Sequence, residues 1–391
     1  MPALLGGGPA FSTPLPSSRP VQPNRQTLHE HLDAILDRNW YTNNGPLVRE
    51  LELRLARQMQ VRNCVLCSSA TMGLELLSRT LNLTGEVIVP AFTFVATAHA
   101  FLSNGGNPVF CDIDAETMTM SPEHCAKLVG RNTRAICAVH LWGRPAKIAA
   151  FQAIADEYDI PLLFDAAHAF GVSIHGRPIG GFGRAEVFSF HATKLFHTME
   201  GGAVTTNDDE LADQIRQQRN FGFVGYDETD GPGTNAKMTE MSAAFGLSAL
   251  DCFNETRERS REVYKRYQRL LAELPGMDLV EQYDNPTHHR QYVVALLDES
   301  AFGLTRDQLI ESLHAENIIA RRYFAPGCHR LQPYATREGG SPVLETTDRI
   351  VQRVIVLPGG AAITNAEIDL VVDRLTSIHR YAARIRTALD S

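Results

Sequence analysis

The feature that most constrains this fold is the alternation of short apolar runs with helix-length segments between residues 64 and 205. Near-continuous apolar runs separated by helices are typical of a parallel or mixed sheet that is buried on both faces. We therefore expect an α/β fold with a doubly wound sheet. The expected strands are Cys64–Cys67, Val87–Val89, Pro108–Cys111, Ala135–Val139, Pro161–Phe164, Glu186–Phe190 and Ala203–Thr205.

Breaks in composition divide the chain into three parts. Six prolines and a run of three glycines within residues 1–23 predict an extended N-terminal arm that is not an element of the core. A long helical pattern over Met238–Leu274 ends at Pro275-Gly276, where we place a domain boundary. The expected parts are an arm at 1–26, a large domain at 27–274 and a smaller α+β domain at 275–391. Further expected elements are helices at Leu28–Arg38, Leu47–Met59, Arg306–Glu316 and Ala366–Leu389, and strands at Arg290–Leu297 and Ile318–Arg321.

Charge and cysteine content exclude several classes of protein. The 37 basic and 45 acidic residues give a net charge of -8, so no overall positive field favours nucleic acid or an anionic membrane. The uncharged stretch Val87–Cys111 is interrupted by Pro90 and by Asn104–Pro108, which predicts strand, helix, turn and strand instead of a membrane span. Seven scattered cysteines and the lack of a signal-like N-terminus favour a reducing, cytoplasmic location.

A carboxylate and a lysine follow two of the expected strands. Asp165 comes directly after the apolar run ending at Phe164, and Lys194 lies in the loop after the run ending at Phe190. Ligands of open α/β sheets bind beyond the carboxyl ends of the strands. Pyridoxal phosphate requires an amine that forms a Schiff base and an anion that keeps its pyridine nitrogen protonated. The combination of Asp165 and Lys194 therefore points to this cofactor.

Other residues could complete such a site. Ser69, Ala70 and Thr71 open an expected helix and offer backbone and hydroxyl donors to a phosphate. Ser189 could add a hydroxyl, and Phe92-Thr93-Phe94 could supply an apolar or aromatic face for the ring. Each of these has an ordinary structural alternative, since a loop lysine is usually a surface charge, a strand-end Asp or a Ser can cap a helix, and a Phe usually packs in the core.

Cysteine and histidine patterns do not indicate a metal site. Cys64 and Cys67 have the spacing of a zinc or redox pair, but no second pair stands at zinc-site spacing, so we assign them to a buried strand. Several histidines lie near strand ends without a His-Glu-x-x-His motif. A dinucleotide-binding dehydrogenase is disfavoured because no Gly-x-Gly-x-x-Gly follows the first strand.

Taken together, these motifs resemble the nucleotide-sugar aminotransferases of the DegT/DnrJ/StrS type, within the fold type I pyridoxal phosphate enzymes. The resemblance covers nearly the whole chain and implies a mixed, mostly parallel seven-stranded sheet in the large domain. It rests on Trp40 through Pro46, Val89 through Thr97, Asp165-Ala166-Ala167-His168-Ala169, Ser189 through Lys194, Glu200-Gly201-Gly202 and Gly233 through Met238.

The resemblance implies roles for individual residues. Lys194 would form the Schiff base, Asp165 would pair with the pyridine nitrogen, and His168 would lie near the cofactor oxygen. Asn235 would reach the phosphate from a partner subunit, which implies a homodimer with shared active sites. The remaining cofactor-binding residues implied are Ser69, Ala70, Thr71, Phe94 and Ser189.

Three departures from common family patterns matter. Ala70 stands where many members have Gly, and Met199 precedes Glu200 where many have Gly. Relatives that act as 3-dehydratases carry His in place of the Schiff-base lysine, whereas this chain keeps Lys194. A transaminase is therefore favoured.

Within the family, the chain looks most similar to enzymes that aminate C4 of dTDP-4-keto-6-deoxy-D-glucose with L-glutamate as donor, giving a precursor for antibiotic or glycan sugars. Tyr226, Lys237, Arg321, Arg322 and Tyr323 are candidates for contacting that substrate. Amination at C3, a GDP- or UDP-linked sugar, and a non-catalytic regulator that binds pyridoxal phosphate remain as alternatives.

Overall fold

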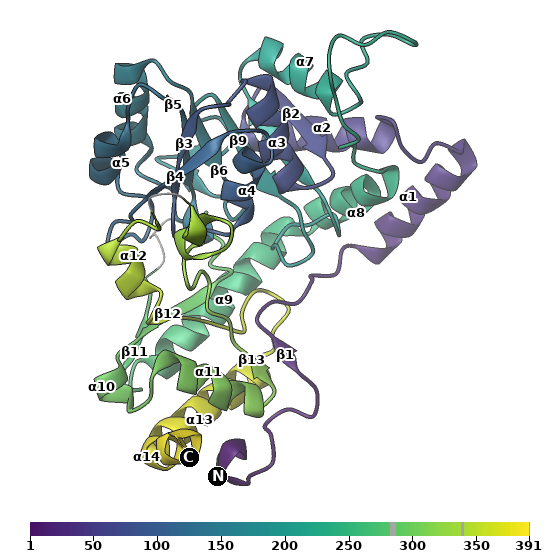
Figure 1. The fold of residues 1–391 in the computed structure, drawn as a ribbon. Helices are drawn as coiled ribbons and strands as arrows, with labels where there is room; N and C mark the ends of the chain where they lie inside the picture. Colours follow the sequence, from purple (N-terminus) through teal and green to yellow (C-terminus); the bar gives the residue numbers. More distant parts are fainter. Residues whose placement is uncertain (282–286, 338–339, 391) are drawn as a thin grey trace.

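A seven-stranded sheet forms the centre of the larger part of the molecule (Figure 1). The computed structural model describes residues 1–281, 287–337 and 340–390. The strand order is β2-β10-β9-β6-β5-β3-β4; β10 runs antiparallel to both of its neighbours, and the other neighbouring pairs are parallel. The strands are β2 (Asn63–Cys67), β3 (Glu86–Pro90), β4 (Asn107–Cys111), β5 (Thr133–Val139), β6 (Leu162–Asp165), β9 (Ala185–Ser189) and β10 (Gly202–Thr206). The predicted α/β class and mostly parallel sheet are confirmed, and each predicted strand overlaps one of these.

Helices cover both faces of this sheet, which explains the near-continuous apolar runs. In β3, Val87 and Val89 pack with α3 (Ala70–Thr80), α4 (Ala96–Leu102) and α7 (Asp209–Gln218), while Ile88 packs with α5 (Pro122–Leu128) and α6 (Ile148–Tyr158) on the other face. Alternate residues of a strand point to opposite faces, so both sets must be apolar. Towards the β2 edge, α2 (Pro46–Met59) packs on β2, α8 (Glu240–Asp251) packs on α2, and α1 (Arg25–Arg38) packs on α8.

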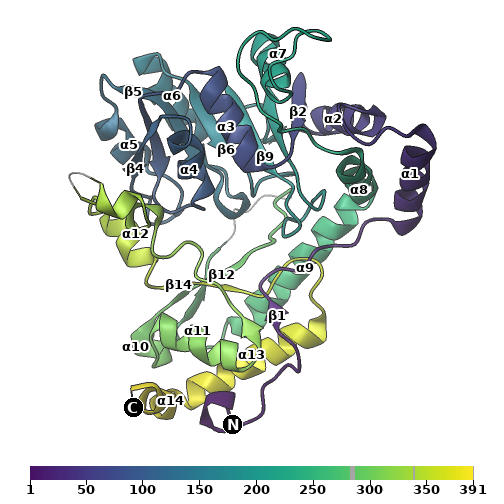
Figure 2. The same cartoon turned by 45° about the vertical axis from the view of Figure 1, so that its right-hand side comes forward.

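A second core lies at the other end of the molecule, where both chain ends are found (Figure 2). It contains the antiparallel strands β11 (Met277–Leu279), β12 (Val293–Leu297) and β14 (Val354–Leu357), in that order in the sheet. The helices around it are α9 (Phe253–Leu271), α10 (Glu299–Phe302), α11 (Arg306–Ala315), α13 (Asn365–Arg380) and α14 (Ala382–Asp390). The helix α12 (Glu345–Ile350) lies instead against the large sheet, where the Thr346 and Thr347 amides donate to Asp112 after β4. Short elements elsewhere are the hairpin β7 (Ser173–Ile174) and β8 (Arg177–Pro178) and 3-10 turns at Ala3–Leu5, Leu141–Gly143, Cys328–Arg330 and Tyr334–Thr336.

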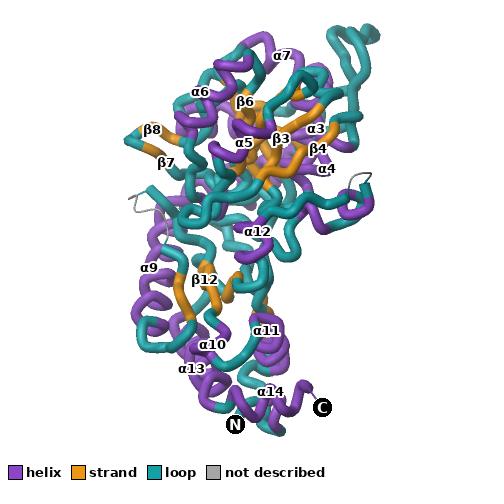
Figure 3. Tube along the Cα trace, turned by 60° about the vertical axis from the view of Figure 1, so that its left-hand side comes forward, coloured by secondary structure: helices purple, strands orange, loops and turns teal. Residues whose placement is uncertain are grey.

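The helix α9 belongs to both cores, and Figure 3 shows it running alongside α13 in the smaller part. Phe253 at its start packs in the core beneath the large sheet, whereas Val263 and Tyr267 pack in the second core. The predicted domain boundary after Leu274 stays a prediction. The packing of α9 favours a boundary within this helix, between Phe253 and Val263.

The predicted N-terminal arm is extended, but the expectation that it is not an element of the core is wrong. Leu15 is 1% exposed within the second core, and Leu15–Pro16 (β1) pairs in parallel with Ile318–Ile319 (β13). The buried carboxylate of Glu316 accepts hydrogen bonds from the Ala3 and Ala10 amides at 2.7 and 2.9 Å. A buried carboxylate and an open strand edge both require partners, and the arm supplies them.

Two predicted long helices are each broken in two. The helix predicted over Met238–Leu274 is interrupted at Cys252, and the one over Ala366–Leu389 at Tyr381, where the backbone has φ near -105° and ψ near 10°. The predicted strand Ile318–Arg321 narrows to two residues, because Arg321 pairs separately with Val356. Among the described residues, no helix is both long and apolar enough to cross a membrane.

Candidate active site

The predicted cofactor residues converge on a cavity of about 320 Å³ at the carboxyl ends of β5, β6 and β9. This is the edge of the sheet at which a parallel α/β fold binds ligands. The cavity is lined by nine of the predicted residues, namely Ser69, Ala70, Thr71, Phe94, Asp165, His168, Ser189, Lys194 and Tyr323.

Asp165 is the last residue of β6 and is 6% exposed. Its Oδ2 accepts a hydrogen bond from the Thr97 hydroxyl at 2.7 Å, and its Oδ1 accepts one from the Ala167 amide at 3.0 Å. These donors fix the orientation of the carboxylate at the floor of the cavity. A carboxylate held in this way can stabilise a protonated nitrogen of a bound ring.

Lys194 lies in the loop that follows β9, and its amide donates to the carbonyl of His191 at 2.8 Å. Its Nζ is 3.3 Å from the hydroxyl of Tyr292. Withdrawal from water lowers the pKa of this lysine from 10.5 to about 8, although the charge of Asp165 opposes the change. An amine with this pKa is partly neutral near pH 7.5 and can act as a nucleophile or a base.

The start of α3 forms part of the cavity wall, through Ser69, Ala70 and Thr71. Ser69 is the N-cap of this helix, and its hydroxyl accepts from the Met72 amide at 3.1 Å. The amides at the start of a helix lack partners within the helix and favour an anion there. A Cβ on Gly202 of β10 would lie 2.5 Å from the Ala70 nitrogen, so only glycine leaves this end of the helix open.

Aromatic rings form one wall of the cavity. The His168 ring is nearly parallel to that of Phe324, with centroids 6.1 Å apart, and is tilted against Tyr292. The Nδ1 of His168 accepts from the Trp142 amide, and burial followed by the charge of Lys194 keeps the pKa of His168 well below its usual value. His168 is therefore a neutral ring. Phe94 stands at the mouth and is 56% exposed.

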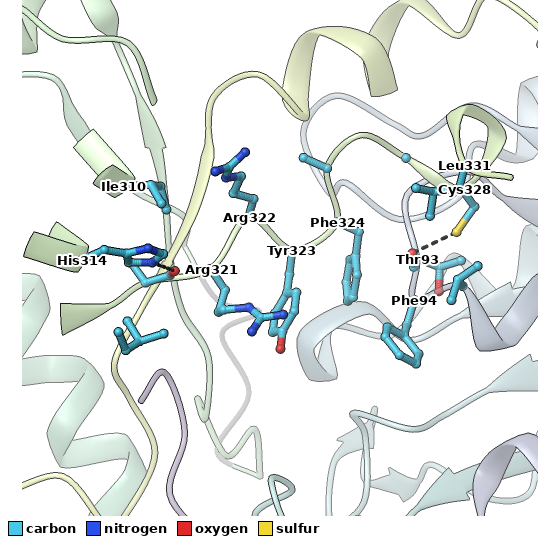
Figure 4. A pocket seen from close by; sticks show the side chains of 15 residues that line it. Thr93, Phe94, Ile310, His314, Arg321, Arg322, Tyr323, Phe324, Cys328 and Leu331 are labelled. Carbon is cyan, nitrogen blue, oxygen red and sulfur yellow. Dashed lines mark hydrogen bonds between the residues drawn. The ribbon is translucent and has the colours of Figure 1, made fainter. Parts of the chain in front are cut away.

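A second cavity of about 400 Å³ adjoins the first and shares Thr93, Phe94, Tyr323 and Phe324 with it. Figure 4 shows Arg321 lying beside Tyr323, with its guanidinium carbon 5.0 Å from the ring centroid. Arg322 points elsewhere, and it forms an ion pair with Asp307 at 3.3 Å. Within the described part of the chain, Arg321 has no acidic partner. Arg321 is thus a cation without an acidic partner among the described residues, and it lines the second cavity beside Tyr323, which lines both.

Three predicted residues lie outside both cavities. Tyr226 is 99% exposed, the Lys237 ammonium lies 4.5 Å from the ring centroid of Phe221, and Asn235 pairs with Asn220. They share the segment 220–237, which also exposes apolar side chains. These are Phe221, Phe223 and Val224.

Several lining residues were not singled out from the sequence. Ser17 and Ser18 come from the N-terminal arm, Tyr292 directly precedes β12, and Val356 lies on β14. Nothing local marks the arm serines. Thr97 lies within the motif that begins at Val89, so its contact with Asp165 could have been sought there.

These groups fit pyridoxal phosphate. An amine of lowered pKa, a fixed carboxylate and an unobstructed helix start face one cavity, and together they match the aldehyde, the ring nitrogen and the phosphate of that cofactor. No group of three or more His, Cys, Asp or Glu side chains that could hold a metal occurs among the described residues.

Comparisons with known proteins agree with this chemistry. The model of the DegT/DnrJ/EryC1/StrS aminotransferase family matches residues 23–376. The chain is 34% identical over 361 residues to a dTDP-4-amino-4,6-dideoxy-D-glucose transaminase of Shigella dysenteriae, covering 92% of this chain and 98% of the relative. It is 32% identical over 348 residues to the Escherichia coli protein of the same name, covering 88% and 93%. The crystal structure of DesI in the presence of its TDP-sugar product is 44% identical, with a TM-score of 0.92 and coverage of 98% of each chain.

Proposed function

Because the chain belongs to the DegT/DnrJ/EryC1/StrS aminotransferase family, whose members depend on pyridoxal phosphate, we propose that this aminotransferase acts at C4 of dTDP-4-keto-6-deoxy-D-glucose. L-glutamate would donate the amino group, and the product would be dTDP-4-amino-4,6-dideoxy-D-glucose. The observation that carries the proposal is the convergence of Lys194 and Asp165 on one cavity in a chain that is similar to transaminases of that name. The TDP-sugar in the related DesI structure supports the nucleotide.

Pyridoxal phosphate supplies an aldehyde that takes up the amino group and a ring that accepts the electron pair left when a C–H bond is broken. Asp165 would keep the ring nitrogen protonated, because an ionised carboxylate in a cavity with little water favours the charged form of its partner. The start of α3 and the hydroxyls of Ser69, Thr71 and Ser189 would hold the phosphate. Neutral His168 and Phe94 would confine the ring.

Lys194 would have two tasks. Its amine would hold the cofactor in the absence of substrate, and the same Nζ, once freed, would accept a proton from carbon and later give it back. A pKa of about 8 suits both tasks, since the amine changes protonation state close to neutral pH. Glutamate and the keto sugar would take turns in the same cavity.

The diphosphate of a nucleotide sugar needs cations that are not already paired. Arg321 meets this requirement in the second cavity, and Tyr323 beside it lines both cavities. We assign the diphosphate to Arg321, and we assign Arg322 a lesser role because it pairs with Asp307. The adjoining cavity gives the nucleotide room beyond the cofactor.

The proposal includes a homodimer in which Asn235, Tyr226 and Lys237 serve the partner's site. Within one chain these residues lie outside the cavities, on a segment that exposes apolar side chains. Exposed apolar side chains that gather on one segment are typical of an interface. A cytoplasmic setting is also proposed, supported by seven cysteines that are all free.

The test is to incubate the purified holoenzyme with glutamate and dTDP-4-keto-6-deoxy-D-glucose and to solve the product by NMR. We expect nitrogen on C4 in the equatorial arrangement and release of 2-oxoglutarate. Nitrogen on C3, an axial amine, or faster conversion of a GDP- or UDP-linked sugar would refute the substrate. The absence of amino transfer with every donor and sugar would favour the regulator alternative.

A further inference from the structure

Two consecutive residues, Gln291 and Tyr292, contact opposite ends of Lys194. The Gln291 amide oxygen accepts a hydrogen bond from the Leu195 amide at 3.1 Å, and its Nε2 donates to the Thr193 carbonyl at 2.5 Å. The hydroxyl of Tyr292 lies 3.3 Å from the Lys194 Nζ. One short segment before β12 therefore holds both the backbone and the amine of the lysine.

A third contact comes from the N-terminal arm. The Ser18 hydroxyl donates to the same Thr193 carbonyl at 2.9 Å. The peptide groups on both sides of Lys194 are thus bonded to side chains that are distant in sequence. The hydrogen bond that Lys194 forms within its own loop is the one from its amide to the His191 carbonyl.

The hydrogen bonds of the Gln291 amide indicate a role beyond filling space. Gln291 is 5% exposed, and a buried amide costs stability unless its donor and its acceptor are both satisfied. Here the oxygen and the nitrogen of the amide each bond to one of the two neighbours of one lysine. An apolar side chain of the same size would fill the space without that cost.

The task of Lys194 explains why its backbone needs fixing. Its Nζ must move between carbons while staying within reach of them, and a displacement of about 1 Å at a reacting group can cost about 100-fold in rate. Four flexible side-chain bonds already give the amine its freedom. A mobile loop would let the amine move further from the position that the reaction needs.

We propose that Gln291 is a positioning residue for Lys194, holding the peptide groups on either side of the lysine together with Ser18. The proposal rests on the proposed function in one respect, namely that Lys194 is the lysine that binds the cofactor. It assigns Gln291 no contact with the substrate. The role of Gln291 does not depend on which sugar the enzyme uses.

The experiment first reduces the holoenzyme with borohydride and maps the modified lysine, which tests the proposed site independently of Gln291. Gln291→Met, which fills the space but forms neither bond, is then compared with Gln291→Glu, which keeps an acceptor for Leu195. Gln152→Met on α6 is the matched control, because it removes a glutamine that bonds Asp156 far from the loop. The measurements are amide exchange of Leu195 and glutamate turnover.

In Gln291→Met we expect Leu195 exchange to rise about tenfold, as loss of its one hydrogen bond to Gln291 predicts, and kcat to fall about tenfold, with KM for glutamate changed less than about twofold. Gln291→Glu should keep Leu195 protected. Wild-type exchange and kcat in a folded Gln291→Met protein would overturn the proposal, as would equal loss of Leu195 protection in Gln291→Met and in the control Gln152→Met. Labelling of another lysine would instead refute the proposed site.

Ser18→Ala provides a second route if Gln291→Met does not fold. Thr193 loses one of two donors in Ser18→Ala, one in Gln291→Glu, and both in the double variant. We therefore expect each single change to lower kcat less than threefold and the double change to lower it by more than the product of the two. If the double variant instead lowered kcat by only the product of the two single effects, Ser18 and Gln291 would not act together on the Thr193 carbonyl.

Discussion

The pKa of Lys194 provides a quantitative test of the site that requires no substrate. A fall from 10.5 to about 8 raises the neutral fraction of this amine about 300-fold at pH 7, since each unit of pKa is a factor of ten. About one Lys194 in ten would then be neutral at pH 7. The cause is burial, because an ammonium loses its hydration in the cavity.

Lys147 provides an internal comparison. Its ammonium lies 2.8 Å from Asp114 on the surface, and this hydrogen bond raises its pKa above 10.5. Cofactor-free protein is labelled briefly with acetic anhydride across a pH series and then analysed by peptide mapping. This measures the reactivity of both lysines in the same sample. We expect half-maximal reactivity of Lys194 near pH 8 and that of Lys147 above pH 10.5.

The direction in which the Lys194 pKa moves when the charge of Asp165 is removed provides a second check. Asp165 raises the pKa of Lys194, so Asp165→Asn should move the midpoint of Lys194 below 8 and leave Lys147 unchanged. A Lys194 midpoint near 10.5 in folded, cofactor-free protein would refute the argument from burial. An upward shift in Asp165→Asn would refute the electrostatic argument.

Three further outcomes are expected. Asp165→Asn should fold but lose about 100-fold or more in transfer rate in a steady-state assay, because a neutral amide cannot keep the ring nitrogen protonated; near-normal turnover would make Asp165 structural. Mixing Lys194→Ala with Asn235→Ala chains should restore activity by forming one sound site per hybrid dimer, and lack of recovery after confirmed subunit exchange would count against shared sites. Gly202→Ala should weaken cofactor binding about tenfold in an equilibrium titration, because its Cβ would lie 2.5 Å from the Ala70 nitrogen; unchanged affinity would exclude this end of the cavity as the phosphate site.

The strands could be predicted because the sheet is buried on both faces. Val87, Ile88 and Val89 meet helices on opposite faces, so no polar residue interrupts the run, and the pattern is visible without tertiary information. Asp165 and Ser189 could be found for a related reason. Each is the last residue of a strand, and strand ends of a parallel sheet meet at one edge.

The breaks in the helices were not visible from the sequence. Cys252 and Tyr381 are ordinary residues for a helix, and neither Gly nor Pro marks the interruption. At Cys252 the chain passes from the helix beneath the large sheet to α9, which continues into the second core. That change of direction is set by the relative placement of two cores, which no local pattern reports.

Local sequence patterns likewise predict only some of the residues around Lys194. Asp165 is placed by the strand that it ends, whereas Ser18 and Gln291 reach the Thr193 carbonyl across separations of 175 and 98 residues. Their chemistry is unremarkable in the sequence, since a serine in a proline-rich arm and a glutamine before a strand have many ordinary uses. The sheet thus places the groups that would bind the cofactor, while the arm and the second core place the backbone of the lysine that would act on it. A substitution in the arm or the second core can therefore alter Lys194 while the sheet and Asp165 stay as they are.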